Sequence, residues 1–393
     1  MSPNPQMPAA GAQMQHFVRD EEFDPASVEK LTPEQEKIFF ASQTRLMWWK
    51  FKKHKLALWS GIFLIVLYGS ILFSEFLAPY GLNNRHVDFI HAPAQSLHLF
   101  HEGEFIGPFV YGTSYKLNME NLKRTYTPDT NKVQKIRFFC RGESYKYWGL
   151  WKSDLHLYCP AISGTLFLHG TDRLGRDVMS RMIYGARISL TIGLIGITIS
   201  FLLGISIGGI AGYYGGMADM VIQRIIEVLQ SIPSVPLWLA LAAIMPVTWS
   251  PLVVYFGITI ILGLIDWTGL ARAVRSKLLA LREEDYVLAA QLMGAKPKRI
   301  IARHLVPGFM SHLIATATIT IPTMILGETA LSFLGLGLRA PITSWGVLLT
   351  EAQNINAVAL YPWLLYPVVP VIMVILAFNF LGDGLRDAAD PYK

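Results

Sequence analysis

Residues 282–307 read REEDYVLAAQLMGAKPKRIIARHLVP and separate two long hydrophobic stretches of the chain. Ala289 and Ala290 favour a helix in the first half of this segment. Gly294 favours the left-handed conformation in which many helices end, and Pro297 suits the first turn of a following helix. The segment therefore predicts a helix, a hinge and a second helix.

Outside this segment the chain is dominated by long apolar runs. Of its 393 residues, 52% are hydrophobic and only 16% are charged. Such runs are typical of membrane-spanning helices, so we predict an all-α polytopic membrane protein. We expect six spans, the third of them interrupted by Pro233 and Pro236. The runs cover residues 56–78, 188–213, 225–247, 252–269, 313–334 and 363–381.

These runs divide the chain into parts. The first transmembrane helix is expected at 56–78, and a core of five further helices at 188–385, including a long loop at 272–308. Basic residues flank the spans and crowd that loop: Arg45, Lys50, Lys52, Lys53, Lys55, Lys296, Lys298, Arg299 and Arg303. Because basic segments beside spans remain in the cytoplasm, we expect loop 272–308 and both termini, 1–55 and 386–393, on that side. Lipid headgroups account for the net charge of +6 without nucleic acid.

The N-terminal tail has no cleavable signal peptide by pattern, since its first forty residues lack an apolar core after a basic start. We therefore expect the first span to direct insertion. Thr32 and Gln35 form a capping-box start, which predicts an interfacial helix within residues 1–55.

The segment 79–169 is expected on the opposite, periplasmic side as a small insert that contains strands. Cys140 and Cys159 both lie there, and in an oxidising compartment they can form a disulfide worth about 3 kcal/mol. The alternative is a pair of buried free thiols. Four histidines of the insert fit no tight ligand pattern, so we expect no metal site: His86, His91, His98 and His101.

Residues 170–187 predict an interfacial helix before the second span, with Asp172 as its cap and an ion pair between Asp177 and Arg181. Headgroup anchoring is one explanation of its charges. The other is that three arginines receive a delivery protein: Arg173, Arg176 and Arg181.

Glycines and carboxylates mark the expected spans. Gly204, Gly208 and Gly212 recur every four residues and predict close packing of the second span against another helix. Glu328 follows long apolar residues, and a carboxylate at membrane depth faces a bundle interior or a wet cavity. It therefore either lines a translocation path or is buried and hydrogen-bonded to the next loop. We expect Asp266 nearer the inner interface, as an anchor.

The loop resembles the cytoplasmic coupling loop of ABC-importer permeases, in the version found in the C-type permease of dipeptide and oligopeptide importers. The matching residues are Tyr286, Ala289, Ala290, Gly294, Arg299, Ile300, Arg303, His304 and Pro307. The resemblance continues through SFLGLG, SWG at 344–346 and GDGLRDAADP at 382–391. Leu288 and Gly308 depart from the usual glutamate and asparagine, and the enlarged insert indicates a separate branch.

This resemblance implies a permease subunit of an ATP-driven importer for peptides or peptide-like solutes in the bacterial inner membrane. The implied partners are a second homologous permease in a heterodimer, two ATPase subunits and a periplasmic substrate-binding protein. ATP and Mg²⁺ would bind the partners, and no cofactor or metal is expected on this chain, which has no GxxxxGK[ST] phosphate loop. The coupling residues implied are Asp285, Tyr286, Val287, Ala289, Ala290, Gly294, Arg299 and Pro307.

Two other functions are compatible with parts of the sequence. A proton-coupled secondary transporter would use Glu328 as its relay and would need no ATPase. A membrane-anchored enzyme would have its active site in the insert 79–169, although that segment shows no recognisable catalytic arrangement.

Overall fold

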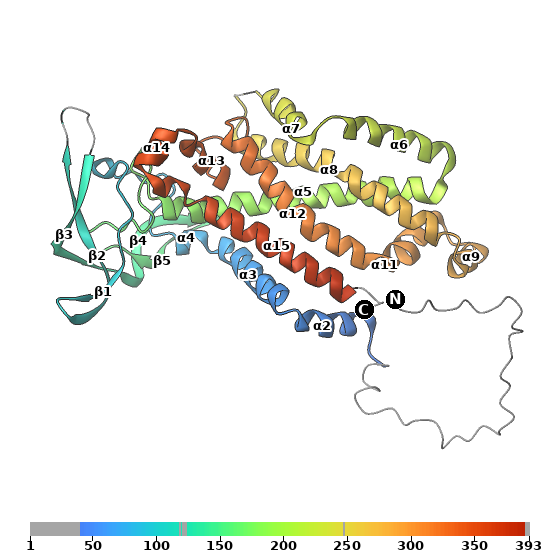
Figure 1. The fold of residues 1–393 in the computed structure, drawn as a ribbon, viewed down its shortest axis with the longest axis horizontal. Coiled ribbons are helices and arrows are strands. Elements are labelled where there is room, and N and C mark those ends of the chain that lie inside the picture. The colour runs from blue at the N-terminus through green and yellow to red at the C-terminus, as the bar shows by residue number, and fades with distance from the viewer. Residues whose placement is uncertain (1–39, 118, 120–123, 247, 390–393) are drawn as a thin grey trace, which may run out of the picture. The chain divides into compact units, whose positions relative to one another are not determined.

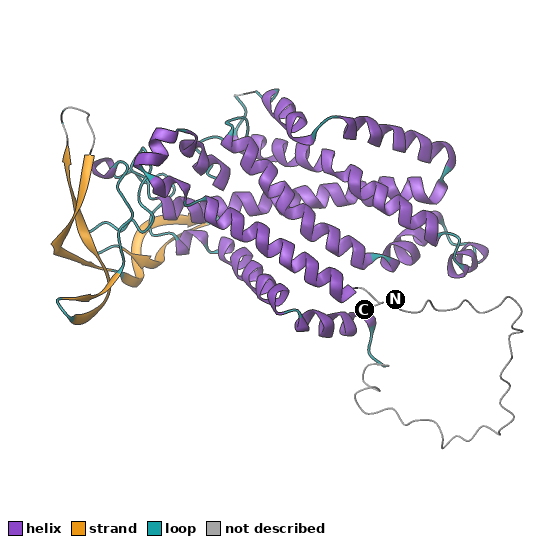
Figure 2. Cartoon of the chain, in the orientation of Figure 1, coloured by secondary structure: helices purple, strands orange, loops and turns teal. Residues whose placement is uncertain are grey.

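The computed structural model describes residues 40–117, 119, 124–246 and 248–389, and the arrangement given below is that of residues 47–389. Long helices form a bundle, and strands form a small insert at one end of it (Figures 1 and 2). The predicted helical polytopic membrane protein with a strand-containing insert is confirmed. The predicted start of a helix at Thr32 lies outside the described residues.

Five helical segments in the described part of the chain are long and apolar enough to span a membrane. They are α3 (Lys55–Leu72), α5 (Val178–Tyr214), α8 (Pro251–Leu281), α12 (Met310–Phe333) and the segment Pro362–Ala389, which contains α15 (Val368–Ala389). A short helix, α2 (Gln43–Lys53), precedes α3. The apolar run 56–78 is not one helix, because a break at Phe73 separates α3 from α4 (Ser74–Leu77).

The third apolar run forms two helices, α6 (Gly216–Ser231) and α7 (Ser234–Ala243), that meet at a bend of 83°. Proline chemistry accounts for the bend. Ile232 precedes Pro233 and is therefore held in an extended conformation, which ends α6. Pro236 lies in the first turn of α7, where its missing N–H group costs no helical hydrogen bond.

The glycines of α5 pack against α8. A Cβ atom added to Gly204 would lie 2.8 Å from the side chain of Leu270, and one added to Gly212 would lie 2.8 Å from the carbonyl oxygen of Arg275. At Gly208 such an atom would overlap the backbone of Ala271. The two helices therefore approach so closely that only a hydrogen atom fits at these positions.

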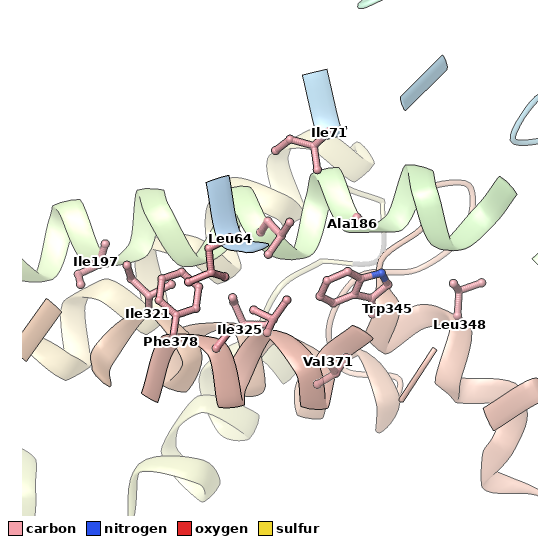
Figure 3. Close-up of a cluster of buried hydrophobic side chains, with 13 residues drawn as sticks. Leu64, Ile71, Ala186, Ile197, Ile321, Ile325, Trp345, Leu348, Val371 and Phe378 are labelled. Atoms are coloured by element: carbon pink, nitrogen blue, oxygen red, sulfur yellow. The ribbon is translucent and has the colours of Figure 1, made fainter. Parts of the chain in front are cut away.

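A central hydrophobic cluster joins α5 to α3, α12, α15 and the short α13 (Trp345–Leu349). Figure 3 shows the indole of Trp345 directed between α5 and α15, beside Ala186 and Val371. Its Nε1 atom donates a hydrogen bond to the carbonyl oxygen of Met182 at 3.1 Å. Between α13 and α15 the chain forms short helices: η4 (Thr350–Gln353), α14 (Ile355–Leu360) and η5 (Pro362–Leu365).

The insert contains a helical turn, η2 (Val87–Phe89), and two antiparallel sheets. The first sheet has the order β1-β2-β3, and the second is the hairpin β4-β5. The strands are β1 (His98–His101), β2 (Glu104–Leu117), β3 (Arg124–Lys135), β4 (Arg137–Tyr147) and β5 (Trp151–Cys159). The predicted disulfide between Cys140 and Cys159 is present and joins the two strands of the hairpin.

Residues 170–187 differ from the separate interfacial helix that the sequence predicts. Residues 170–177 form a loop, and α5 begins at Val178 and continues through the span without a break. Asp177 caps α5 by accepting hydrogen bonds from Ser180. The carboxylate of Asp172 stays in the loop and pairs with Arg176 and Arg181, so the expected Asp177–Arg181 pair does not form.

The glycine contact between α5 and α8 gives a first prediction. Gly208→Ala places its methyl group 2.8 Å from the Cα atom of Ala271, and overpacking of this kind costs about 1–3 kcal/mol. We expect a lower thermal unfolding midpoint for the purified protein in detergent. Gly269→Ala on α8 is the matched control, because no atom lies within 4 Å of its added methyl group. Equal midpoints for the two variants would contradict the packing described here.

Candidate functional site

The loop between α8 and α12 lies at the end of the bundle opposite the strands (Figure 1). It begins after Leu281, because α8 continues ten residues into the expected loop 272–308. The loop contains four short helical elements: α9 (Asp285–Leu292), α10 (Pro297–Arg299), a π-helical segment η3 (Ile300–Leu305) and α11 (Val306–Gly308). The order of helix, hinge and helix follows the pattern read from residues 282–307.

The hinge at the end of α9 is a Schellman motif. Gly294 has a φ angle of +78°, in the left-handed region that favours glycine. The backbone N–H of Ala295 donates to the carbonyl oxygen of Ala290 at 3.0 Å, and that of Gly294 donates to Gln291 at 2.9 Å. These bonds satisfy carbonyl groups that the end of a helix otherwise leaves open. The hinge is therefore a hydrogen-bonded turn with a defined geometry.

One face of α9 is packed into the bundle. Val287 and Ala290 are buried in a hydrophobic cluster that joins α9 to α8 and to the segment leading into α12. The other buried members of this cluster are Leu270, Val274, Leu278, Ile300, Leu305, Phe309 and Leu313. Because interiors of this kind are close-packed, a shift of α9 would disturb the packing of the whole cluster, which includes residues of α8 and of the start of α12.

The opposite face of α9 is exposed and apolar. Leu292 and Met293 are 89% and 81% exposed, and Leu288 and Tyr286 are also exposed. A hollow of about 320 Å³ lies beside them, lined by Tyr213, Arg282, Glu283, Leu288 and Gln291. Exposed apolar side chains at a helix end form a surface suited to an apolar groove of another protein.

The structure divides the coupling residues taken from the sequence into two groups. Asp285, Tyr286 and Ala289 are exposed, whereas Val287 and Ala290 face the bundle and cannot touch a partner directly. Sequence reasoning omitted Leu292 and Met293. The signal was present, because Leu288 and Leu292 are four residues apart and lie on the face opposite Val287. Gly294, Arg299 and Pro307 are exposed or partly exposed in the second half of the loop.

Glu328 is fully buried on α12, and its own chain satisfies both of its carboxylate oxygens. Ser189 on α5 donates to Oε2 at 3.0 Å, and Ser332 donates to Oε1 at 2.8 Å. The same serine oxygens accept the backbone N–H groups of Trp345 and Leu338, respectively. Glu328 therefore binds the turn after α12 to α5, which matches the structural alternative read from the sequence.

Asp266 lies at the midpoint of α8, which continues beyond the expected span into the loop 272–308. Its Oδ2 atom is buried and has no hydrogen-bond partner among the described residues. This contrasts with Glu328, whose oxygens both accept hydrogen bonds. A buried carboxylate oxygen without a hydrogen-bond partner in an apolar helix is a candidate for a functional role. Asp266, and not Glu328, is therefore the carboxylate whose burial no described hydrogen bond explains.

The charges before α5 form a largely buried network. Arg176 and Arg181 pair with Asp172, and all three side chains are buried. Arg173 is exposed and pairs with Glu351 at 3.5 Å, which links this loop to η4. Burial raises the pKa of Glu351 above its ordinary value. Of the three arginines expected to meet a delivery protein, only Arg173 is therefore accessible.

The histidines of the insert pack against aromatic rings. His98 and His101 contact Phe109 and Tyr111, and His91 stacks on Tyr361 with ring centroids 4.0 Å apart. In the part of the chain that the structure describes, no group of three or more His, Cys, Asp or Glu side chains is placed to hold a metal ion.

Comparison with known proteins identifies two family models. Residues 204–392 match the binding-protein-dependent transport system inner membrane component, and residues 42–94 match the N-terminal transmembrane domain of oligopeptide transport permease C.

Curated relatives share about two fifths of the aligned residues. The dipeptide transport permease DppC of Bacillus subtilis is 42% identical over 56% of this chain and 68% of its own length. The oligopeptide permease OppC of Haemophilus influenzae is 40% identical over 59% of this chain and 72% of its own length. The glutathione permease GsiD of Pectobacterium atrosepticum is 39% identical over 56% of this chain and 71% of its own length. A solved structure of the MetNI methionine ABC transporter, inward facing, aligns with a TM-score of 0.42 and 19% identity, covering 54% of this chain and 97% of that one.

The hydrogen bonds of Glu328 generate a second prediction. Glu328→Ala removes the acceptor for both serines and leaves buried hydroxyl groups unpaired, at a cost of about 1–3 kcal/mol each. We expect a lower unfolding midpoint and faster proteolysis of residues 335–350. Glu328→Gln keeps the shape and one carbonyl acceptor, so it should retain most of the stability. If Glu328→Gln were stable but abolished transport, Glu328 would act in the translocation path instead.

Proposed function

We infer the function of this chain from the family to which it belongs, the binding-protein-dependent transport system inner membrane components, among which it groups with dipeptide and oligopeptide permeases of the C type. It is a membrane permease subunit of an ABC importer and not itself the ATPase. The relatives named above are permeases for dipeptides, oligopeptides and glutathione. We propose that its substrate is likewise a peptide or a peptide-like solute.

The proposed mechanism rests on one observation: one face of α9 is buried against the bundle and the other is exposed and apolar. Its exposed end, with Leu292 and Met293, would enter a groove on an ATPase subunit, while Val287 and Ala290 keep it joined to the bundle. Movement of the ATPase would then displace α9, and the close-packed cluster would pass this displacement to α8 and α12. Binding and release of the substrate would alternate between the two sides of the membrane.

We propose six spans, counting α6 and α7 together as one bent span beside the five long segments. An even number of spans places both termini on one side of the membrane. The basic residues near α2 and α10 support the cytoplasm as that side. The insert 79–169 would then be periplasmic, and the disulfide between Cys140 and Cys159 fits an oxidising compartment.

The family works in transporter complexes of several subunits, and we propose the composition of this one. A second homologous permease would complete the translocation path, two ATPase subunits would bind ATP and Mg²⁺, and a periplasmic binding protein would deliver the substrate. The exposed α9 end supports an ATPase contact. A proton-coupled carrier based on Glu328 is disfavoured, because both oxygens of that carboxylate accept hydrogen bonds from serines.

The proposed function is tested by reconstitution. The chain is co-expressed with the permease and ATPase genes of its own transport locus, purified, and placed in proteoliposomes with the cognate binding protein. We expect co-purification of all subunits and ATP-dependent uptake of a labelled tripeptide. Uptake driven by a proton gradient without ATP would overturn the proposal.

The exposed end of α9 gives a third prediction for this system. Replacing Leu292 and Met293 together by serine removes the apolar contact without touching the buried face. We expect recovery of the ATPase subunits with the permease to fall about tenfold, since interface anchors of this size contribute 1–2 kcal/mol or more. The matched control replaces Ile355, an exposed residue of α14, by serine. If the double variant assembled and transported normally, α9 would not be the contact.

The hinge gives a fourth prediction. Gly294→Val forces a β-branched residue into the left-handed region, whereas Gly294→Asn introduces a residue that tolerates it. Apart from its own chain neighbours, no atom of the described residues lies within 4 Å of a Cβ atom added to Gly294, so any effect is one of backbone geometry and not of crowding. We expect Val to lower ATP-dependent uptake about tenfold while membrane insertion stays intact, and Asn to retain most uptake. Equal uptake by both variants would show that the turn is not required.

A further inference from the structure

Large apolar side chains remain exposed where the hairpin β4-β5 meets the end of α3. Leu150, at the turn of the hairpin, is 75% exposed, and Phe139 on β4 is 70% exposed. The other exposed members of this group, which we term the aromatic edge, are Leu72, Phe73, Trp148 and Trp151. A patch of this kind on a folded domain marks a surface that another apolar phase covers.

The aromatic edge is fixed to the point where the first span ends. The Nε1 atom of Trp148 donates a hydrogen bond to the carbonyl oxygen of Leu72 at 3.1 Å, and the hydroxyl group of Tyr147 donates to the same oxygen at 2.6 Å. Leu72 is the last residue of α3, one of the membrane-spanning segments. The turn of the hairpin therefore lies beside the last residue of α3.

An ion pair holds the turn in this position. Arg187 on α5 pairs with Glu75 on α4 at 2.5 Å and lies over the ring of Trp148, 4.1 Å from its centroid. Glu75 also accepts the backbone N–H of Trp148 at 3.2 Å. Burial alone would raise the pKa of Glu75, but the hydrogen bond and charge of Arg187 bring that pKa below its ordinary value. The carboxylate thus stays ionised, and the aromatic edge is held by three elements at once.

We propose that residues 147–151 and Phe139 insert into the lipid headgroup region beside α3, so that the aromatic edge anchors the insert to the bilayer surface. The patch is continuous with exposed apolar side chains along α3, which spans the lipid: Ile62, Ile65, Val66 and Leu72. Tryptophan and tyrosine concentrate at this level because one part of each ring is apolar and another carries a hydrogen-bonding group. This inference requires only that α3 spans the membrane and does not depend on the substrate.

The anchor has a structural consequence for the rest of the insert. The hairpin is closed by the disulfide between Cys140 and Cys159, and β4 follows β3 after a single residue, Ile136. Fixing the turn at the lipid surface would therefore limit the positions open to the sheet β1-β2-β3. The lipid contact would add to the protein contacts that already hold the hairpin to α3, α4 and α5.

The proposal is tested with a fluorophore attached to Leu150→Cys in the assembled complex in lipid nanodiscs. Both native cysteines are in the disulfide, so the unsubstituted protein serves as the labelling blank. Nitroxide groups on lipid headgroups and upper acyl chains report contact with the bilayer, and aqueous iodide reports contact with water. Phe105→Cys is the matched control, because Phe105 is 68% exposed but lies on β2, in the other sheet.

We expect lipid nitroxides to quench the label at position 150 at least about twofold more than the label at position 105, with the reverse order for iodide. Equal lipid quenching at both positions would overturn the proposal. Protection of position 150 from both quenchers would also overturn it, because a protein partner and not lipid would then cover the aromatic edge. Leu150 is mostly exposed, so its substitution leaves the packing of the hairpin intact.

Discussion

The burial of Val287 and Ala290 is the packing interaction that joins α9 to the helix bundle. These two side chains belong to a buried cluster that also contains residues of α8, of η3 and of the start of α12, so α9 is packed onto the bundle. The connection continues inward, because α8 packs against the glycines of α5 without room for a single added methyl group. A displacement of α9 would therefore be passed to α8 and α12 through close-packed side chains.

Polar groups hold the other end of the bundle. Glu328 joins α12, α5 and the turn before α13 through serine hydroxyl groups, and Asp172 gathers two arginines at the start of α5. Both clusters are buried, and each would be costly to break because unpaired groups would remain in an apolar setting. Asp266, at the midpoint of α8, is the exception to this pattern, because its Oδ2 atom has no hydrogen-bond partner among residues 40–389 that the structure describes.

The sequence was sufficient where local chemistry decides the structure. Gly294 and Pro297 predicted the hinge, Pro233 the bend between α6 and α7, and the cysteines the disulfide of the hairpin. The sequence was insufficient where contacts with other parts of the fold decide which way a side chain faces. Asp172 was expected to cap a helix, but Arg176 and Arg181 engage its carboxylate. Val287 was expected among the coupling residues, but it is buried, and the exposed apolar residues of this helix end are Leu292 and Met293. Only the position of the bundle defines which side of α9 is inside.

The most direct test of the central claim is photo-crosslinking from α9 in the assembled, transporting complex. A photoreactive amino acid is introduced at Leu292, at Met293 or at Val287, and the adducts are identified by mass spectrometry. We predict adducts with an ATPase subunit from Leu292 and Met293, and only adducts within this chain from Val287. ATPase adducts from Val287, or their absence from both exposed positions in an active complex, would contradict this prediction.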